Sequence, residues 1–513
     1  MSDADSPSKP YPRPVSAELS RTDQFVEFAC LTFQSDDGVR RRRRAERLAA
    51  DPAALAREDF LAAVILGDVA VVARGLAADP GLATRPGGPR GWVPLLYLCF
   101  GRVLAPGAGA DAVEVARLLL RAGADPRSHV LFHGRYRWTA VTAAIGEGES
   151  GPVAAPPHPQ ARPLVELLLD AGADPNDSQA LYNAHFLRDD QWLQLFLSRG
   201  LGPEHVANWT DDDPTRLLDY LLGQAVKQGY AARVALLLAY GASPNGRNHY
   251  DKRRHVEKAH LLGHTGIAWL LVRQGAAPAV LSPAEELRAN LLRGDESAVR
   301  APTADAIEGR DDVGTLLAAA EHGRLRAVRL LLDFGVPVDA ANHDGLTALH
   351  VAAANGHRLV VDELLARGAS SDLRDHVYGG TALGRVTWFS RAWPTPERDE
   401  VRRALVAGST DVFDVAYAGA ADRLAVLLAA DPSRAHARHP THGGSPLHVL
   451  AGQDVPGCEP LIDLLLQHGA DLRARNDQGK TALDVAEEAL ADRVVDVLLA
   501  RGASRARPSR DPE

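Results

Sequence analysis

Three histidines in the last fifth of the chain have a spacing that could bind a metal ion. His436, His439 and His442 follow one another at intervals of three residues, and imidazole is a common ligand for transition metals. Pro440 prevents one regular helix from presenting all three rings on one face. No cysteine lies nearby, and the segment is typical of an exposed loop. The sequence therefore predicts no metal site and no cofactor here.

A run of five arginines, Arg40–Arg44, is the second candidate for chemistry. One interpretation is a patch that binds nucleic-acid phosphates. The other is a solvated helix face whose charge is balanced by the nearby acidic residues Asp36, Asp37, Glu46 and Asp51. A nucleic-acid footprint needs basic residues clustered beyond one helical turn. We therefore expect the helix face, with nucleic-acid binding as an alternative.

Two further segments combine arginine with aromatic residues, the types that carry much of the binding energy at protein interfaces. They are His129–Trp138, with the sequence HVLFHGRYRW, and Arg247–Arg254, with RNHYDKRR. The residues that we predict to bind a partner are His129, Phe132, His133, Arg135, Tyr136, Arg137, Trp138, Arg247, His249, Tyr250, Arg253 and Arg254. The alternative is that these aromatic rings only pin long loops to the protein.

A third segment of this kind is Arg385–Pro394, with the sequence RVTWFSRAWP. It follows a short helix expected to begin at Thr381, so its aromatic residues have two interpretations. They either bind a partner or belong to the core of that helix.

The sequence contains none of the common catalytic motifs, such as a nucleophile elbow, a Walker loop, a dinucleotide fingerprint or a metalloprotease helix. We therefore expect no enzymatic activity. The alternative is a regulatory subunit or a divergent enzyme with a site in residues 178–310, built from residues far apart in the sequence.

The elements that would position these residues are clearest in residues 344–376. Thr347 stands where a helix begins, because its hydroxyl can accept a hydrogen bond from a free amide of the first turn. Gly356 ends that helix by allowing a left-handed backbone. Val360, Val361 and Leu364 then form an apolar stripe on a second helix. One such helix pair cannot bury its apolar face alone and needs copies on both sides.

This unit resembles the ankyrin repeat, from its Thr347-Ala348-Leu349-His350 opening to the glycine that ends its second helix. That glycine recurs at Gly123, Gly172, Gly200, Gly241, Gly275, Gly335, Gly368, Gly408, Gly469 and Gly502. Three of the steps are 33 or 34 residues, close to the ankyrin period. The resemblance implies an all-α solenoid of about 13 helix pairs, in which His350 and His448 brace turns.

The solenoid gives an expected domain organisation. Residues 1–16 form a disordered tail and residues 17–58 a helical cap. Repeats occupy 59–294 and 313–505, separated by an irregular bend at 295–312, and a polar tail follows at 506–513. The proline-rich insertion at 151–162 is expected to project as a loop.

An internal duplication is also indicated. Gly67 is followed by Asp79-Pro80 and Pro94-Leu95-Leu96, and Gly419 is followed by Asp431-Pro432 and Pro446-Leu447-His448. The two sets have the same spacing. Residues 60–100 and 412–452 are therefore predicted to fold as copies of one module.

Composition restricts the function further. The 513 residues are 46% apolar and 5% aromatic with a net charge of −9, which gives no global attraction to nucleic acid or anionic lipid. Three cysteines, the lack of a long apolar stretch and the polar N-terminus predict a cytoplasmic protein with no membrane span. The 52 arginines against five lysines resemble a GC-rich bacterial proteome. Together with the repeats, these features predict a non-catalytic scaffold that binds one or more proteins.

Overall fold

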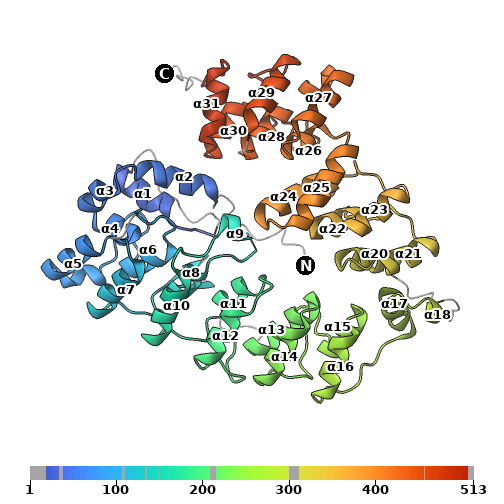
Figure 1. Ribbon diagram of the computed structural model, residues 1–513, viewed down its shortest axis with the longest axis horizontal. Helices are drawn as coiled ribbons and strands as arrows, with labels where there is room; N and C mark the ends of the chain where they lie inside the picture. The colour runs from blue at the N-terminus through green and yellow to red at the C-terminus, as the bar shows by residue number, and fades with distance from the viewer. Residues whose placement is uncertain are drawn as a thin grey trace, which may run out of the picture. The chain divides into compact units, whose positions relative to one another are not determined.

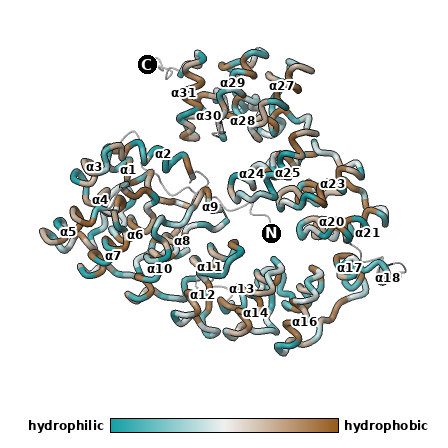
Figure 2. The backbone as a smooth tube through the Cα atoms, in the orientation of Figure 1, coloured by the Kyte–Doolittle hydropathy of each residue, from teal (hydrophilic) through white to brown (hydrophobic). Residues whose placement is uncertain are grey.

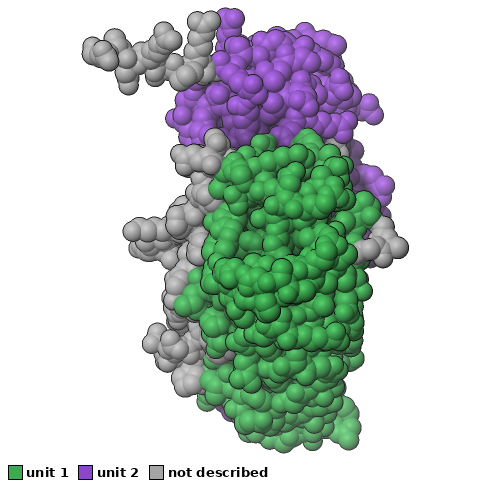
Figure 3. Space-filling view, turned by 90° about the vertical axis from the view of Figure 1, so that its left-hand side faces the viewer, with its two compact units in different colours: residues 1–260, 264–279 green, residues 261–263, 280–513 purple. Residues whose placement is uncertain are grey.

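The computed structural model describes residues 19–33, 38–106, 110–132, 136–149, 151–207, 215–299, 311–453, 455 and 457–505. The chain forms two compact units, which are coloured separately in Figure 3. Unit 1 extends to His260 and includes His264–Ala279, whereas unit 2 comprises Leu261–Gly263 and the chain from Val280 onwards. None of the described helices is long and apolar enough to span a membrane.

Unit 1 begins with three helices, α1 (Arg21–Ala29), α2 (Val39–Leu48) and α3 (Pro52–Glu58). Helix pairs then follow in chain order (Figure 1). They are α4 (Phe60–Leu66) and α5 (Val69–Ala78), α6 (Pro94–Phe100) and α7 (Ala112–Arg121), α8 (Ala140–Ile145) and α10 (Ala161–Asp170), α11 (Ser178–Ala184) and α12 (Gln191–Ser198), α13 (Leu217–Gln228) and α14 (Ala231–Ala239), and α15 (His255–Leu261) and α16 (Thr265–Arg273).

Unit 2 continues the same pattern. Its pairs are α17 (Pro283–Arg293) and α18 (Glu296–Val299), α20 (Asp312–Glu321) and α21 (Leu325–Asp333), α22 (Ala348–Asn355) and α23 (Arg358–Ala366), α24 (Ala382–Ala392) and α25 (Pro396–Gly408), α26 (Val412–Tyr417) and α27 (Ala421–Ala430), α28 (Pro446–Gln453) and α29 (Cys458–Gln467), and α30 (Ala482–Glu488) and α31 (Asp492–Ala500). The described chain thus contains 13 pairs, as the repeat spacing predicted.

Each unit is held together by packing between the corresponding helices of neighbouring pairs. First helices pack on first helices, as in α22, α24 and α26, and second helices pack on second helices, as in α21, α23 and α25. All seven residues of α6 are buried, whereas α23 buries only the stripe of Val360, Val361 and Leu364. Figure 2 shows the resulting alternation of apolar and polar residues along the helices.

The helix boundaries have the expected local causes. The Thr347 hydroxyl accepts a hydrogen bond from the amide of His350 at the start of α22. Gly356 ends α22 with a left-handed φ of 76°, a conformation that glycine adopts without a Cβ penalty. A Cβ there would lie 3.1 Å from the backbone nitrogen of Arg398, so the close approach of the next pair also favours glycine.

Buried guanidinium groups join neighbouring pairs by donating to backbone carbonyls. Arg102 donates to the carbonyls of Cys99 and Ala143, next to the ends of α6 and α8. Three further arginines make the same kind of bond, and we refer to all four as the arginine staples. The staples are Arg102, Arg233 to His185 and Leu187, Arg324 to Gly263 and Leu292, and Arg398 to Ala354.

The arginine run lies on α2 and differs from both sequence interpretations. Arg41 is only 3% exposed, and its guanidinium contacts the buried carboxylate of Glu27 at 3.2 Å. Arg42 donates to the carbonyls of Val153 and Ala154. Part of the run therefore holds α2 in place instead of facing solvent.

The insertion at 151–162 does not project as a loop, so that prediction was wrong. Residues Gly151–Ala154 form the short helix α9, and Ala155 and His158 are buried. Arg102 donates to the carbonyl of Pro156. Prolines that lack amide donors can still pack tightly when arginine side chains satisfy the nearby carbonyls.

The predicted duplication is confirmed in the order of elements. In residues 60–100 the helices α4 and α5 are followed by a 3₁₀ helix at Pro80–Ala83 and by α6. In residues 412–452 the helices α26 and α27 are followed by a 3₁₀ helix at Pro432–His436 and by α28. The tails at 1–16 and 506–513 and the centre of the expected bend, 300–310, lie outside the described residues.

Candidate interaction surface

The segment His129–Trp138 forms a β-hairpin, the only strand pair within the described residues. Strand β1 (His129–Phe132) pairs antiparallel with β2 (Tyr136–Thr139) in the register His129 to Thr139. His133 and Arg135 lie outside the described residues. The strand alternation turns Trp138 inward and leaves Arg137 exposed.

Trp138 acts as the anchor of this hairpin. It is 7% exposed and stacks on Phe132, with ring centroids 4.5 Å apart. Phe33, from the segment that follows α1, packs edge-on against it at 4.1 Å. Trp138 therefore offers a partner little surface, and its interaction is one of packing.

A pocket of about 480 Å³ opens between the hairpin and the turn before α11. Arg127 and Arg137 line it together with Thr139, Asp174 and Asp177. Asp177 is buried and accepts hydrogen bonds from the hydroxyl of Thr139 and the amide of Ala180. The backbone of Arg137 pairs with that of Leu131, whereas its side chain makes no hydrogen bond or ion pair within the described part of the chain. Asp177 thus has a structural role in the lining of the pocket, whereas the Arg137 side chain is available to a ligand.

The segment Arg247–Arg254 is a rigid turn that displays one aromatic ring. The buried side chain of Asn248 accepts hydrogen bonds from the amides of Tyr250 and Asp251. Arg247 donates to the carbonyl of Lys252, and Arg254 forms an ion pair with Glu257 at 2.6 Å. These contacts close the turn on itself, and Tyr250 remains 66% exposed.

The structure brings the two predicted segments together through a line of phenol rings, which we call the tyrosine stripe: Tyr136, Tyr182, Tyr220 and Tyr250. Tyr220 and Tyr250 have ring centroids 6.5 Å apart and hydroxyl oxygens 3.3 Å apart. Tyr182 and Tyr220 are also 6.5 Å apart. Tyr136 lies close enough to Tyr182 to contribute to its raised pKa.

The stripe crosses the first helices of two pairs, because Tyr182 lies on α11 and Tyr220 on α13. Burial, followed by neighbouring phenols and carboxylates, raises the pKa of Tyr182 and Tyr220. Both hydroxyls therefore remain neutral hydrogen-bond donors. The Tyr182 hydroxyl donates to the carboxylate of Glu149, and the Thr215 hydroxyl lies 3.1 Å from Nδ1 of His249. Sequence reasoning missed Tyr182 and Tyr220, because only stacking brings these helices next to the loops.

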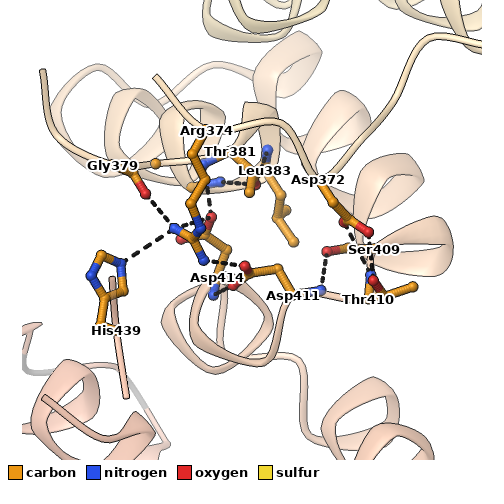
Figure 4. A network of polar contacts seen from close by, with 12 residues as sticks. Asp372, Arg374, Gly379, Thr381, Leu383, Ser409, Thr410, Asp411, Asp414 and His439 are labelled. Carbon is orange, nitrogen blue, oxygen red and sulfur yellow. Dashed lines mark hydrogen bonds and ion pairs between the residues drawn. The ribbon is translucent and has the colours of Figure 1, made fainter. Parts of the chain in front are cut away.

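Unit 2 contains a different polar site, shown in Figure 4. We call the turn between the second helix of one pair and the first helix of the next a finger. The finger before α22 spans the residues between Gly335 and Thr347, whereas Gly408 is followed almost at once by Asp411, the N-cap of α26. The α26–α27 pair therefore has no finger of its own.

A network centred on Arg374 occupies this gap. The Arg374 guanidinium, from the finger 369–380, contacts the carboxylates of Asp411 and Asp414 and lies 3.3 Å from Nε2 of His439 (Figure 4). Asp414 accepts a hydrogen bond from the amide of Thr381 at 2.9 Å. Burial, with the nearby Asp411 charge, raises the pKa of Asp414. The network joins the fingers on either side of the gap.

The three histidines of the triplet are not grouped around one point. The rings of His439 and His442 stack with centroids 4.0 Å apart. Burial, together with His442 and Arg374, lowers the pKa of His439 to about 4. In the described parts of the chain no three side chains are grouped to hold a metal ion.

His350 and His448 brace turns, as the repeat resemblance implied. Nε2 of His350 donates to the carbonyl of Gly380, which leaves Nδ1 to accept from Thr347, 2.8 Å from its hydroxyl. His448 makes the equivalent contacts with Lys480 and Ser445. Burial lowers the pKa of both rings, so they act as neutral links.

The comparisons with known proteins agree with this architecture. Residues 316–365 match the family model described as ankyrin repeats (many copies). The chain is 33% identical over 174 residues to ankyrin repeat and SAM domain-containing protein 6 of Danio rerio, covering 31% of this chain and 22% of that protein. It is 29% identical over 199 residues to the B-cell lymphoma 3 protein homolog of Mus musculus, covering 38% and 36%.

A shorter match, 45% over 49 residues, joins 10% of the chain to 44% of Notch-regulated ankyrin repeat-containing protein B of Danio rerio. The chain thus spans less than half the length of these relatives. Together with the stacked helix pairs, the comparisons show that the chain contains ankyrin repeats. These relatives come from animals, and a bacterial origin stays a prediction.

Proposed function

We propose that the chain is a non-catalytic cytoplasmic scaffold whose protein partner binds the tyrosine stripe and the two segments at its ends. The observation that carries this proposal is the continuity of Tyr136, Tyr182, Tyr220 and Tyr250 across four consecutive repeats. Tyrosine supplies a large contact area and a hydrogen bond at a low cost in side-chain entropy. The exposed ring of Tyr250 at one end of the stripe and the half-buried Tyr136 beside Arg137 at the other supply the residue types that anchor interfaces.

Ankyrin repeats are protein-interaction modules, and the named relatives support that class of function. In the region 178–310 the described helices α11 to α18 are repeat pairs, which gives an enzymatic site no domain of its own. The partial burial of the arginine run weighs against the nucleic-acid alternative, because a phosphate footprint needs accessible cations. The three buried free thiols Cys30, Cys99 and Cys458 suit a reducing compartment.

Site-directed photo-cross-linking in cells tests this proposal. Replacing Tyr250 with p-benzoylphenylalanine puts a reactive ketone on a ring that is already 66% exposed. We expect one predominant cross-linked protein, which mass spectrometry identifies. The matched control carries the same group in place of Val426 on α27, a residue that is 56% exposed and lies on a second helix in unit 2.

A second arm uses the combined change of Tyr136, Arg137 and Tyr250 to alanine. Trp138 is left intact because it is buried and its loss would disturb the hairpin. Capture of the cross-linked protein should fall about tenfold or more, with an unchanged melting temperature. Equal cross-linking at positions 250 and 426, or undiminished capture by the triple variant, would show that this face is not the site.

A further inference from the structure

One repeat in unit 2 departs from its neighbours in several ways, and we call residues 369–408 the extended repeat. Its first helix, α24, has 11 residues, whereas α22 and α26 have 8 and 6. Its second helix, α25, has 13, whereas α23 and α27 have 9 and 10. The arginine- and tryptophan-rich segment 385–394 runs from within α24 to just beyond its end, so it is helical for most of its length.

The C-terminal half of α24 is stabilised by arginine guanidinium groups that lie against aromatic rings. Phe389 lies between the guanidinium groups of Arg385 and Arg398, each 5.7 Å from its ring centroid. The guanidinium of Arg391 lies 4.4 Å from the ring centroid of Tyr417 on the next repeat. The first helix of the extended repeat is therefore fixed on both sides.

Trp388 makes no cation–π contact of this kind. Its ring meets Phe389 edge-on at 4.8 Å, yet the residue is 47% exposed. No other tryptophan, and no phenylalanine, is exposed to this extent on a first helix of unit 2 within the described residues. A rigidly supported and half-exposed indole is the type of residue that anchors an interface.

Arg385 lies one helical turn before Trp388, on the neighbouring part of the same face. Its backbone amide donates to the carbonyl of Thr381, but its side chain makes no hydrogen bond or ion pair with any residue that the structure describes, and its Nε atom is buried without a partner. Burying part of an unpaired guanidinium is unfavourable unless an anion completes it. A carboxylate is therefore the ligand group that would best complement the Arg385 guanidinium.

The finger of the same repeat displays a second aromatic ring. Tyr378 and Val377 are 77% and 52% exposed. The buried carboxylate of Asp375 accepts hydrogen bonds from both of their amides, at 2.7 and 2.9 Å, and Arg374 donates to the carbonyl of Gly379. Across the gap left by the next pair, the tip lies against the following finger, because a Cβ on Gly379 would lie 3.4 Å from Cε1 of His439. The tip is thus ordered before any partner arrives.

We propose that the extended repeat is a second binding site, separate from the tyrosine stripe, for an acidic peptide segment of a partner protein. A carboxylate of that segment pairs with Arg385 in the two-pronged geometry that guanidinium favours. An aromatic or large aliphatic side chain next to it packs on Trp388. Tyr378 contributes contact area from the finger. Charge complementarity favours an acidic segment, because the Arg385 guanidinium has no carboxylate partner among the described residues.

A random peptide library displayed on phage tests the proposal against the full-length protein. We expect enrichment of peptides in which aspartate or glutamate adjoins an aromatic or large aliphatic residue. Synthetic copies of these peptides, followed by fluorescence polarisation, should bind about tenfold or more weakly to Trp388→Ala and to Arg385→Ala. Binding should also weaken as the salt concentration rises.

Matched variants separate binding from folding. Trp388→Phe keeps an aromatic ring on the same support and should retain most of the affinity. Tyr250→Ala changes the tyrosine stripe in unit 1 and should leave the peptide affinity unchanged, so failure of one site is distinguishable from failure of the other. Enrichment of basic peptides, no enrichment, or peptides that bind Trp388→Ala and Arg385→Ala as tightly as the parent would overturn the proposal.

Discussion

Two modules of the molecule are duplicates: residues 60–100 in unit 1 and 412–452 in unit 2. They contain the same elements, but they differ in the sign of the charge that each contributes to its contact with the preceding part of its unit. In the first module the finger supplies a cation, because Arg90 pairs at 2.5 Å with Glu27 from α1. In the second the module supplies the anions, because Asp411 and Asp414 receive Arg374 from the preceding finger. The helices are copies, but their ionic contacts are not.

Adding 352 to a residue number in the first module gives its counterpart in the second, as for Gly67 and Gly419. By this rule the N-cap Asp59 matches the N-cap Asp411, whereas Ala62 matches the buried Asp414. The difference shows that the backbone of a repeat is set by its caps and apolar stripe. The charges at its edge are set by whichever neighbour it meets. The two modules are therefore not interchangeable in the stack.

The largest expected effect is in the first module. Glu27→Gln removes the carboxylate that pairs with the buried guanidinium groups of both Arg41 and Arg90, whose side chains are 4% and 5% exposed. Breaking a buried pair by removing one partner costs about 3–5 kcal/mol. Urea denaturation should show a loss of this size in the free energy of unfolding. A loss as small as that of a surface substitution would show that water reaches the pair.

The corresponding change in the second module is Arg374→Ala. Its guanidinium is 19% exposed and the Asp411 carboxylate 12% exposed, so solvent screens this contact more. Loss of charged hydrogen bonds of this kind costs about 2–3 kcal/mol. We expect hydrogen exchange to accelerate in the finger 369–380 and in α26, while residues 60–100 remain protected. Equal acceleration in both modules would contradict the separation between them.

A smaller effect depends on pH. Burial keeps Asp414 protonated to a higher pH in the folded protein than in the unfolded chain. Between its ordinary pKa and the raised value the unfolded chain releases this proton first, so the contribution of Asp414 to stability falls as the pH rises. The variant Asp414→Asn lacks this titration. The difference in free energy of unfolding, parent minus variant, should decrease between pH 4 and pH 7.

Urea denaturation of both proteins at four pH values measures this difference, because groups remote from Asp414 titrate alike in the two proteins. In the first module Ala62 has no titratable group at this position. A difference that stays flat, or one that increases with pH, would show that Arg374 keeps Asp414 ionised in the folded protein.

The smallest effect should be equal in the two modules. Asp79 accepts a hydrogen bond from the amide of Gly81, and Asp431 accepts one from the amide of Ser433, at the start of equivalent 3₁₀ helices. Replacing either aspartate with alanine removes an exposed cap. We expect both variants to lower the melting temperature by no more than about 3 °C. Unequal shifts would show that the modules differ in more than their ionic contacts.

Much of the fold could be predicted from the sequence. The glycines at the end of the second helices and openings such as Thr347-Ala348-Leu349-His350 act locally, so the helix pairs and their number followed from spacing alone. The hairpin at 129–139 and the packed insertion at 151–162 did not. Both depend on contacts with residues far away in the chain, such as Phe33 and Arg42.

The candidate site was only partly predictable for the same reason. The composition of the two segments in unit 1 identified Tyr136 and Tyr250, but Tyr182 and Tyr220 connect them only after the repeats stack. Gly384 occupies the position that His350 holds in the preceding repeat. A Cβ there would lie 2.5 Å from Oδ1 of Asp414, so glycine is needed for a contact that the local sequence does not contain.

The arginine staples have a consequence for how this protein can change over evolutionary time. Their acceptors are main-chain carbonyls, which every residue type provides. A substitution at an acceptor position such as Ala354 leaves the bond in place, whereas a link between two side chains is lost when either residue mutates. Repeats joined in this way can diverge widely in sequence without separating, which leaves their outward-facing residues open to selection for new ligands.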